Sequence, residues 1–414
     1  MQTFIDPVQK HYETYPYPPR KPEDEKHRLI EGYPSHILEI DHYIFGGKIG
    51  QQKDIRILIA GGGTGDATIM LAQHLKDRNL TAEIIYLDQS QASLDIAKKR
   101  AEIRELTNIK FILNSLEKLP ELNLGFFDYI DCCGVLHHLA NPAEILMHLK
   151  KSLKQYGGIG LMVYGLIGRT GVYELQNALK RLVADQPMAT QIDLAKRLLK
   201  QLPSTNWFIK NTIVKDHLQA GDSGLYDLLL HHRDQAYTTD QLAHLIDQTD
   251  LKIISFIEPW RYNPHYYISD GALLKQLDKL TYIERAALAE ELAGNMKIHV
   301  CYITHKNNFP PIMNEINDNQ AAPILRHRNG LELAKAVKGK DNIQITLDNL
   351  PIVFPIPRLS GPILNLIDGK NSLETIYNNL NKKQNLTWDV FKNEFHSLYR
   401  VFNAINQMFI YYPN

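Results

Sequence analysis

A cluster of glycines after an apolar segment is the strongest chemical signal in the sequence. The stretch RILIAGGGTGD places Gly61, Gly63 and Gly65 between a predicted strand and a predicted helix. Glycine lets the backbone turn tightly and approach a ligand that a Cβ atom would block. The N-terminus of the following helix offers unpaired N–H groups and partial positive charge, which suit a carboxylate or a phosphate. The loop is therefore predicted to bind an anionic part of a ligand.

An acidic residue ends the next predicted strand, EIIYLD, at Asp88. A carboxylate in that position can accept hydrogen bonds from both ribose hydroxyls of an adenosine group. A dinucleotide and S-adenosylmethionine both fit a glycine loop with a ribose acid. The dinucleotide fingerprint G-x-G-x-x-G/A would have Asp66 as its last position, and a negative side chain is a poor neighbour for a pyrophosphate. The alternating glycines favour S-adenosylmethionine instead.

These residues need a scaffold, and the pattern from residue 51 to residue 306 predicts one. Short apolar runs such as IKFIL and IGLMVYG alternate with segments of helical spacing. That alternation indicates βαβ units and a parallel sheet covered on both faces, an α/β fold. The alternation stops after Gly165, and residues 172–236 have the pattern of a helical insertion. It resumes with LKIISFIE and closes with KIHVCYITH.

Residues 56–164 resemble the class I S-adenosylmethionine-dependent methyltransferases of bacteria. The resemblance includes NSLEKLP (114–120), similar to the segment that lines the adenine, and GFFDYIDCCGVLHHLANP (125–142), similar to the segment of the fourth strand. GGIGLMVYG (157–165) is similar to the hairpin of the fifth strand. The resemblance implies a Rossmann-like, seven-stranded, doubly wound sheet whose last strand is antiparallel, and S-adenosylmethionine as the cofactor.

The resemblance also implies which residues hold the cofactor. They are the glycine loop, the ribose acid with its neighbour, and residues after the third and fourth strands: Gly61, Gly62, Gly63, Thr64, Gly65, Asp88, Gln89, Ser115, Leu116, Cys133 and Gly134. This chain departs from many relatives at two positions. Ile59 stands where relatives carry an acid two residues before the first glycine, and Ser115 stands where they carry an aspartate at the adenine. Each departure removes a carboxylate.

The acceptor side has two groups of candidates. His137 and His138 follow the fourth strand, close to the expected methyl group, and either is a candidate base for an acceptor that arrives protonated. The alternative is that this pair only packs or caps a helix. The second group closes the insertion, where a polar helix surface is the alternative; its members are Tyr226, Asp227, His231, His232 and Arg233. Tyr226 is the catalytic candidate here and His231 a substrate-side candidate.

The predicted domains follow one another along the chain. Residues 1–50 form an arm with one or two helices, in which Tyr12, Tyr15 and Tyr17 are candidates for a lid and Arg20 for a carboxylate partner. The alternative is a proline-rich leader packed on the surface. The methyltransferase domain covers 51–306, a linker 307–325, and a small α+β, winged-helix-like accessory domain 326–414.

Composition excludes several other classes of protein. The formal net charge is zero, so no nucleic acid and no anionic membrane is expected as a partner. The N-terminus resembles no signal peptide, no stretch approaches the ~18 apolar residues of a spanning helix, and we expect a cytoplasmic protein. The histidine spacing matches no metal pattern, so no metal is predicted. The C-terminal unit is expected to contact protein or to form a homodimer.

The sequence thus predicts an enzyme that methylates a small molecule or a natural-product intermediate. One alternative is a protein side chain as the acceptor, with the C-terminal unit recognising the target. The other is a scaffold that binds the cofactor without catalysis, an alternative that the two missing carboxylates favour.

Overall fold

The computed structural model describes residues 6–308, 318–327 and 329–412. The chain forms two compact units that interleave along the sequence. Unit 1 contains residues 1–36, 54–252 and 294–305, and unit 2 contains 37–53, 253–293 and 306–414. The consecutive domain boundaries expected from the sequence stay a prediction.

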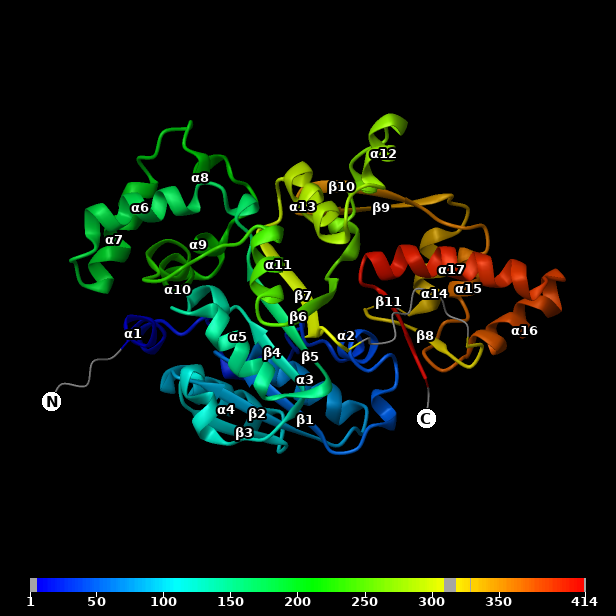
Figure 1. The fold of residues 1–414 in the computed structure, drawn as a ribbon, viewed down its shortest axis with the longest axis horizontal. Coiled ribbons are helices and arrows are strands. Elements are labelled where there is room, and N and C mark those ends of the chain that lie inside the picture. Colours follow the sequence, from blue (N-terminus) through cyan, green and yellow to red (C-terminus); the bar gives the residue numbers. More distant parts are fainter. Residues whose placement is uncertain (1–5, 309–317, 328, 413–414) are drawn as a thin grey trace. The chain divides into compact units, whose positions relative to one another are not determined.

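A seven-stranded sheet forms the framework for the glycine loop (Figure 1). Its strands are β1 (Ile55–Ala60), β2 (Ala82–Asp88), β3 (Ile109–Leu113), β4 (Phe127–Cys133), β5 (Leu153–Tyr164), β6 (Leu251–Phe256) and β7 (Ile298–His305). The order is β3-β2-β1-β4-β5-β7-β6, and β7 runs antiparallel to β5. The predicted Rossmann-like sheet with an antiparallel last strand is confirmed.

The sequence explains why these segments form inner strands. All but one residue of IRILIA in β1 are buried, as expected for a parallel strand covered on both faces. The connecting helices have apolar stripes that cover the sheet. They are α3 (Asp66–Asp77), α4 (Gln91–Ile103), α5 (Pro142–Lys151) and α11 (Thr239–Asp247). Short 3₁₀ turns follow β3 and β4 at Leu116–Leu122 and Leu136–His138.

Helices fill the segment between β5 and α11. They are α6 (Val172–Val183), α7 (Met188–Leu199), α8 (Trp207–Lys210), α9 (Asp216–Gln219) and α10 (Gly221–Leu225), followed by a π-helical turn, η6 (Tyr226–Leu230). Val172, Leu179 and Phe208 belong to their shared apolar core. The arm of unit 1 holds α1 (Pro7–Thr14) and a 3₁₀ turn at Pro22–Lys26.

Unit 2 has an α+β composition with its own core, in which Phe354, Phe391 and Phe395 are fully buried. Its helices are α2 (Ile37–Tyr43), α12 (Gly271–Leu277), α13 (Tyr282–Ala293), α14 (Gly330–Val337), α15 (Ser360–Leu364), α16 (Leu373–Gln384) and α17 (Trp388–Ala404). The strand pairs are β9 (Asn342–Leu347) with β10 (Leu350–Pro355), and β8 (Ala322–Leu325) with β11 (Met408–Tyr411). The winged-helix comparison stays a prediction. Among the described residues, no helix is long and apolar enough to cross a membrane.

Candidate active site

The glycine loop connects β1 to α3 in a conformation that needs glycine. Gly65 has a φ of 100° and caps the N-terminus of α3, a backbone state that side chains disfavour. A Cβ atom on Gly62 would lie 2.1 Å from the ring of Tyr86. The Tyr86 hydroxyl donates a hydrogen bond to the carbonyl of Gly63 at 2.6 Å. Neighbouring side chains therefore hold the loop in this conformation.

Asp88 lies at the end of β2, directly beside this loop. One carboxylate oxygen accepts the N–H of Gly63 at 2.7 Å, and the other accepts the N–H of Ser90 at 2.8 Å. Burial raises the pKa of Asp88, and these backbone donors oppose that effect. Each oxygen keeps a lone pair for a ligand hydroxyl.

A cavity of about 370 Å³ opens over the loop. Its walls include all eleven residues expected to hold the cofactor, together with one candidate base and two of the candidate lid tyrosines. These are Gly61, Gly62, Gly63, Thr64, Gly65, Asp88, Gln89, Ser115, Leu116, Cys133, Gly134, His138, Tyr12 and Tyr17. The glycine loop, Asp88 and the segments after β3 and β4 thus line one and the same cavity.

Five of the predicted site residues lie outside the lining of this cavity. His137 is fully buried and its ring packs at a tilt against Tyr164 with ring centres 3.9 Å apart. Neither ring nitrogen has a hydrogen-bond partner among the described residues. Burial lowers the pKa of His137 well below its usual value, so the ring is neutral. Tyr226 stacks on Tyr15 and donates its hydroxyl hydrogen bond to Gln191 at 3.2 Å. Tyr15 is thus the third residue outside the lining. The other two, Arg20 and His231, make the contacts described below.

His138 is the histidine of the pair that reaches the cavity. Its Nδ1 lies 2.9 Å from the carbonyl oxygen of Arg233. A carbonyl only accepts, so Nδ1 carries the hydrogen and Nε2 keeps its lone pair. Nε2 makes no hydrogen bond within the described part of the chain. The ring of His138 stacks on His231 with centres 3.9 Å apart, which fixes its plane.

Asp227 forms the centre of the polar network at the same end of the cavity. It lies in the π-helical turn and is 2% exposed. The hydroxyls of Tyr12 and Tyr164 each donate to one of its oxygens at 3.0 Å. Burial raises the pKa of Asp227, and these hydroxyls lower it. Asp227, Tyr12 and Tyr164 all line the cavity.

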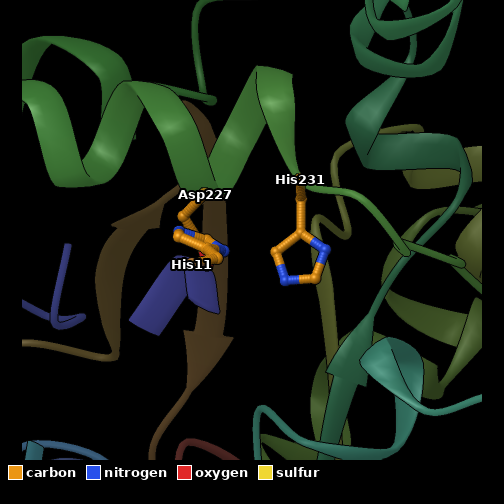
Figure 2. Close-up of side chains that lie close together, drawn as sticks. All are labelled: His11, Asp227 and His231. Atoms are coloured by element: carbon orange, nitrogen blue, oxygen red, sulfur yellow. The ribbon is translucent and has the colours of Figure 1, made fainter. Parts of the chain in front are cut away.

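His11, Asp227 and His231 place ligand-type atoms within 4.8 Å of one another, close enough to raise the question of a metal (Figure 2). The hydrogen bonds of His231 argue against one. Its Nδ1 accepts the backbone N–H of Arg233 at 3.0 Å, so a neutral ring carries its hydrogen on Nε2. Nε2 in turn lies 3.3 Å from the hydroxyl of Tyr12. His231 therefore has no lone pair left for a metal and belongs to the network around Asp227.

The N-terminal arm packs on the glycine loop through charged contacts. Arg20 binds Asp66 at 2.6 Å, and Arg100 binds the other oxygen of Asp66 at 2.7 Å. Burial alone would raise the pKa of Asp66, but the two guanidinium groups lower it below its usual value. Thr64 also donates to the carbonyl of Pro18 at 2.8 Å. Asp66 is thus neutralised within the protein, and Arg20 is engaged with it.

Sequence reasoning did not single out several lining residues, among them Asn114, Asp131 and Tyr164. Asp131 had a visible signal, because an acid inside the apolar strand FDYIDCC requires a reason for its burial. Tyr164 had none, because a tyrosine at a strand end is common.

The comparisons with known proteins agree on the fold and the family. Residues 51–207 match the family model described as a methyltransferase domain. An uncharacterised protein of Synechococcus is 30% identical over 287 residues, which is 68% of this chain and 67% of that protein. The chain belongs to the class I S-adenosylmethionine-dependent methyltransferases. S-adenosylmethionine is the cofactor of this family.

More distant relatives cover parts of the methyltransferase. The ubiquinone biosynthesis O-methyltransferase of Acinetobacter baylyi is 26% identical over 104 residues, 25% of this chain and 41% of that enzyme. The solved structure of PKMT2 from Rickettsia typhi has a TM-score of 0.60 at 16% identity, covering 90% of this chain and 75% of that one. That likeness concerns the fold alone.

The residues of the cavity fit this cofactor. Asp88 presents a carboxylate with free lone pairs beside the loop, and the N-terminus of α3 opens on the same cavity. Tyr12, Tyr17 and Tyr164 also line the cavity, and aromatic rings are a suitable environment for a sulfonium cation.

Proposed function

We propose that this methyltransferase methylates a small molecule whose accepting atom arrives protonated, and that His138 removes the proton. The observation that carries the proposal is the tautomer of His138, because the Arg233 carbonyl holds the hydrogen on Nδ1 and leaves a basic Nε2 in a residue that lines the cavity. A base is needed for a hydroxyl or an amine in its charged form, and is not needed for a thioether or a free amine.

The cofactor supplies an electrophilic methyl group, and the chain's own residues do the rest. We assign the ribose to Asp88 and Gln89, the adenine to Ser115 and Leu116, and the methionine end to the glycine loop with Cys133 and Gly134. The fixed loop aligns the donor, while Tyr12 and Asp227 hold the acceptor side of the cavity. Alignment of the two reactants and exclusion of water supply most of what a methyl transfer needs.

Burial of the acceptor-side groups supports a small acceptor. His138 is 4% exposed and Asp227 is 2% exposed, so the surface of a folded protein does not reach them while α1 is in place. The alternative, a protein side chain as the acceptor, requires the arm to open. We assign the roles of Tyr15, Tyr17 and Arg20 to the arm as a lid, and His137, Tyr226 and His231 to its support.

The experiment uses labelled cofactor to separate these acceptors. The protein is incubated with methyl-labelled S-adenosylmethionine and a cell extract, and small molecules are separated from protein. Label in the small-molecule fraction supports the proposal, whereas label in a protein band supports the alternative. A matched reaction with His138→Gln distinguishes catalysed transfer from background. Equal label with both proteins would refute the role of His138.

A further inference from the structure

Asp131 is a buried acid on β4 that faces the cofactor cavity. In the parallel pair of β1 and β4, Asp131 lies directly opposite Ile59. Neighbouring residues in register point to the same face of a sheet, and both residues line the cavity. The family resemblance implies an acid at the position of Ile59, two residues before the first glycine. The carboxylate absent from β1 therefore has a counterpart one strand away.

The surroundings of Asp131 leave its negative charge uncompensated. The side chain is 1% exposed, and the hydroxyl of Ser35 and the backbone N–H of Cys133 donate to it. Its neighbours across the two adjacent strands are Ile59 and Gly160, which offer no charge. No ion pair involves Asp131 within the described residues. A buried carboxylate with two neutral donors and no cation is costly, and a ligand cation would relieve that cost.

The order of the strands indicates which cation reaches this position. The adenine residues follow β3, the ribose acid ends β2, and the glycine loop follows β1. A cofactor laid across the strands in that order brings its amino-acid end to the next strand, β4. Asp131 lies on β4, on the far side of the loop from Asp88.

We propose that Asp131 binds the α-ammonium group at the methionine end of the cofactor, and so supplies from β4 the acid that the resemblance implies at Ile59 on β1. The inference rests on the proposed placement of S-adenosylmethionine in this cavity. The Ser35 hydroxyl orients the carboxylate, and the ammonium group completes its charge balance. Burial raises the pKa of Asp131 to about 6, as expected for a carboxyl group that still lacks its cation.

Two ligands test this assignment by calorimetry. S-adenosylhomocysteine has the amino-acid end, and 5′-methylthioadenosine has the same nucleoside and thioether without it. Asp131→Asn is expected to weaken the affinity for S-adenosylhomocysteine by about 10- to 100-fold, because one charge-assisted contact is lost. The affinity for 5′-methylthioadenosine should change by less than about twofold. Asp88→Asn should weaken the affinity for both ligands, because both carry the ribose.

A matched control lies on the same strand. Asp128 binds Lys154 at 2.7 Å and does not line the cavity, so Asp128→Asn should leave both affinities unchanged. In the double variant Ile59→Asp with Asp131→Asn, the acid returns to β1, and affinity for S-adenosylhomocysteine should recover by at least about tenfold.

Other results would overturn the assignment. An unchanged affinity of Asp131→Asn for S-adenosylhomocysteine would refute the assignment. An equal loss of affinity for both ligands would also refute it, because a purely structural role of Asp131 predicts that result. If the folded double variant does not recover affinity for S-adenosylhomocysteine, a carboxylate at position 59 cannot take the place of the one at position 131. If the unaltered protein binds neither ligand, the placement of the cofactor fails instead, and the two failures are thereby distinguished.

Discussion

The two ends of the cavity are built in different ways. At the cofactor end, the groups come from short segments, and the backbone N–H groups of Gly63 and Ser90 donate to the carboxylate of Asp88. At the acceptor end, isolated side chains come from distant segments, and the hydroxyl of Tyr12 donates to Asp227, 215 residues further along the chain. A site built from backbone needs glycines at fixed spacing, and that need is visible in the sequence. A site built from side chains leaves no comparable pattern.

The largest expected effect concerns the acceptor end alone. His138→Gln keeps a donor for the Arg233 carbonyl but loses the basic nitrogen, so kcat should fall by about 10²- to 10⁴-fold. Affinity for S-adenosylhomocysteine should stay within about twofold, because the base does not hold the cofactor. Initial rates of label transfer and calorimetry measure the two quantities. Because His244 is exposed, His244→Gln serves as the control. A loss of cofactor affinity in His138→Gln would show that the acceptor end and the cofactor end do not act separately.

The next effect concerns the cofactor end. Asp88→Ala removes the acceptor that we propose for the ribose hydroxyls and the partner of the Gly63 N–H, so affinity for S-adenosylhomocysteine should fall by at least about 100-fold. Asp95 lies on the exposed side of α4, so Asp95→Ala is the matched control. Retained cofactor affinity in a folded Asp88→Ala protein would show that the ribose lies elsewhere.

The charge of the buried Asp131 is expected to make stability depend on pH. Burial raises the pKa of Asp131 from its usual 3.8 to about 6 in the folded protein. Folding therefore favours the protonated form of Asp131. The resulting contribution to the stability of the folded protein is complete below pH 3.8 and is lost as the pH rises through 6. The groups around the carboxyl are neutral: the hydroxyls of Ser35 and Tyr129, and the thiols of Cys132 and Cys133.

Asp131→Asn should consequently raise the melting temperature of the cofactor-free protein by about 2–6 °C above pH 6. The gain should shrink as the pH falls toward 4. Differential scanning calorimetry across that range measures it, with Asp128→Asn as the reference. A gain that does not depend on pH would mean that the charge of Asp131 carries no cost in the folded state.

The smallest effect tests how far the acceptor end depends on a single hydroxyl. Tyr12→Phe keeps the ring, which stacks on His11 with centres 4.4 Å apart, and removes one of the two hydroxyls that donate to Asp227. Because Tyr164 still donates to the other oxygen, kcat/KM for the acceptor should fall by only about 3- to 10-fold. Cofactor affinity should not change. A loss as large as that of His138→Gln would make Tyr12 part of the proton transfer.

The sequence by itself determined the fold class and the family. Apolar runs that alternate with amphipathic helices form a parallel sheet because each helix must cover a face. The spacing of Gly61, Gly63 and Gly65 before a helix, with Asp88 at the next strand end, then indicated the cofactor. These features are local, and local features are the ones that a single sequence displays.

The tertiary structure decided how the remaining side chains are used. It brought Arg20 and Arg100 to Asp66, so the charge of this acid is balanced within the protein. It placed His138 in the cavity wall and His137 outside it, although the two are adjacent. The register of β4 against β1 set Asp131 beside Ile59. Strand register and long-range hydrogen bonds depend on segments far apart in the chain, which is why no local pattern contained them.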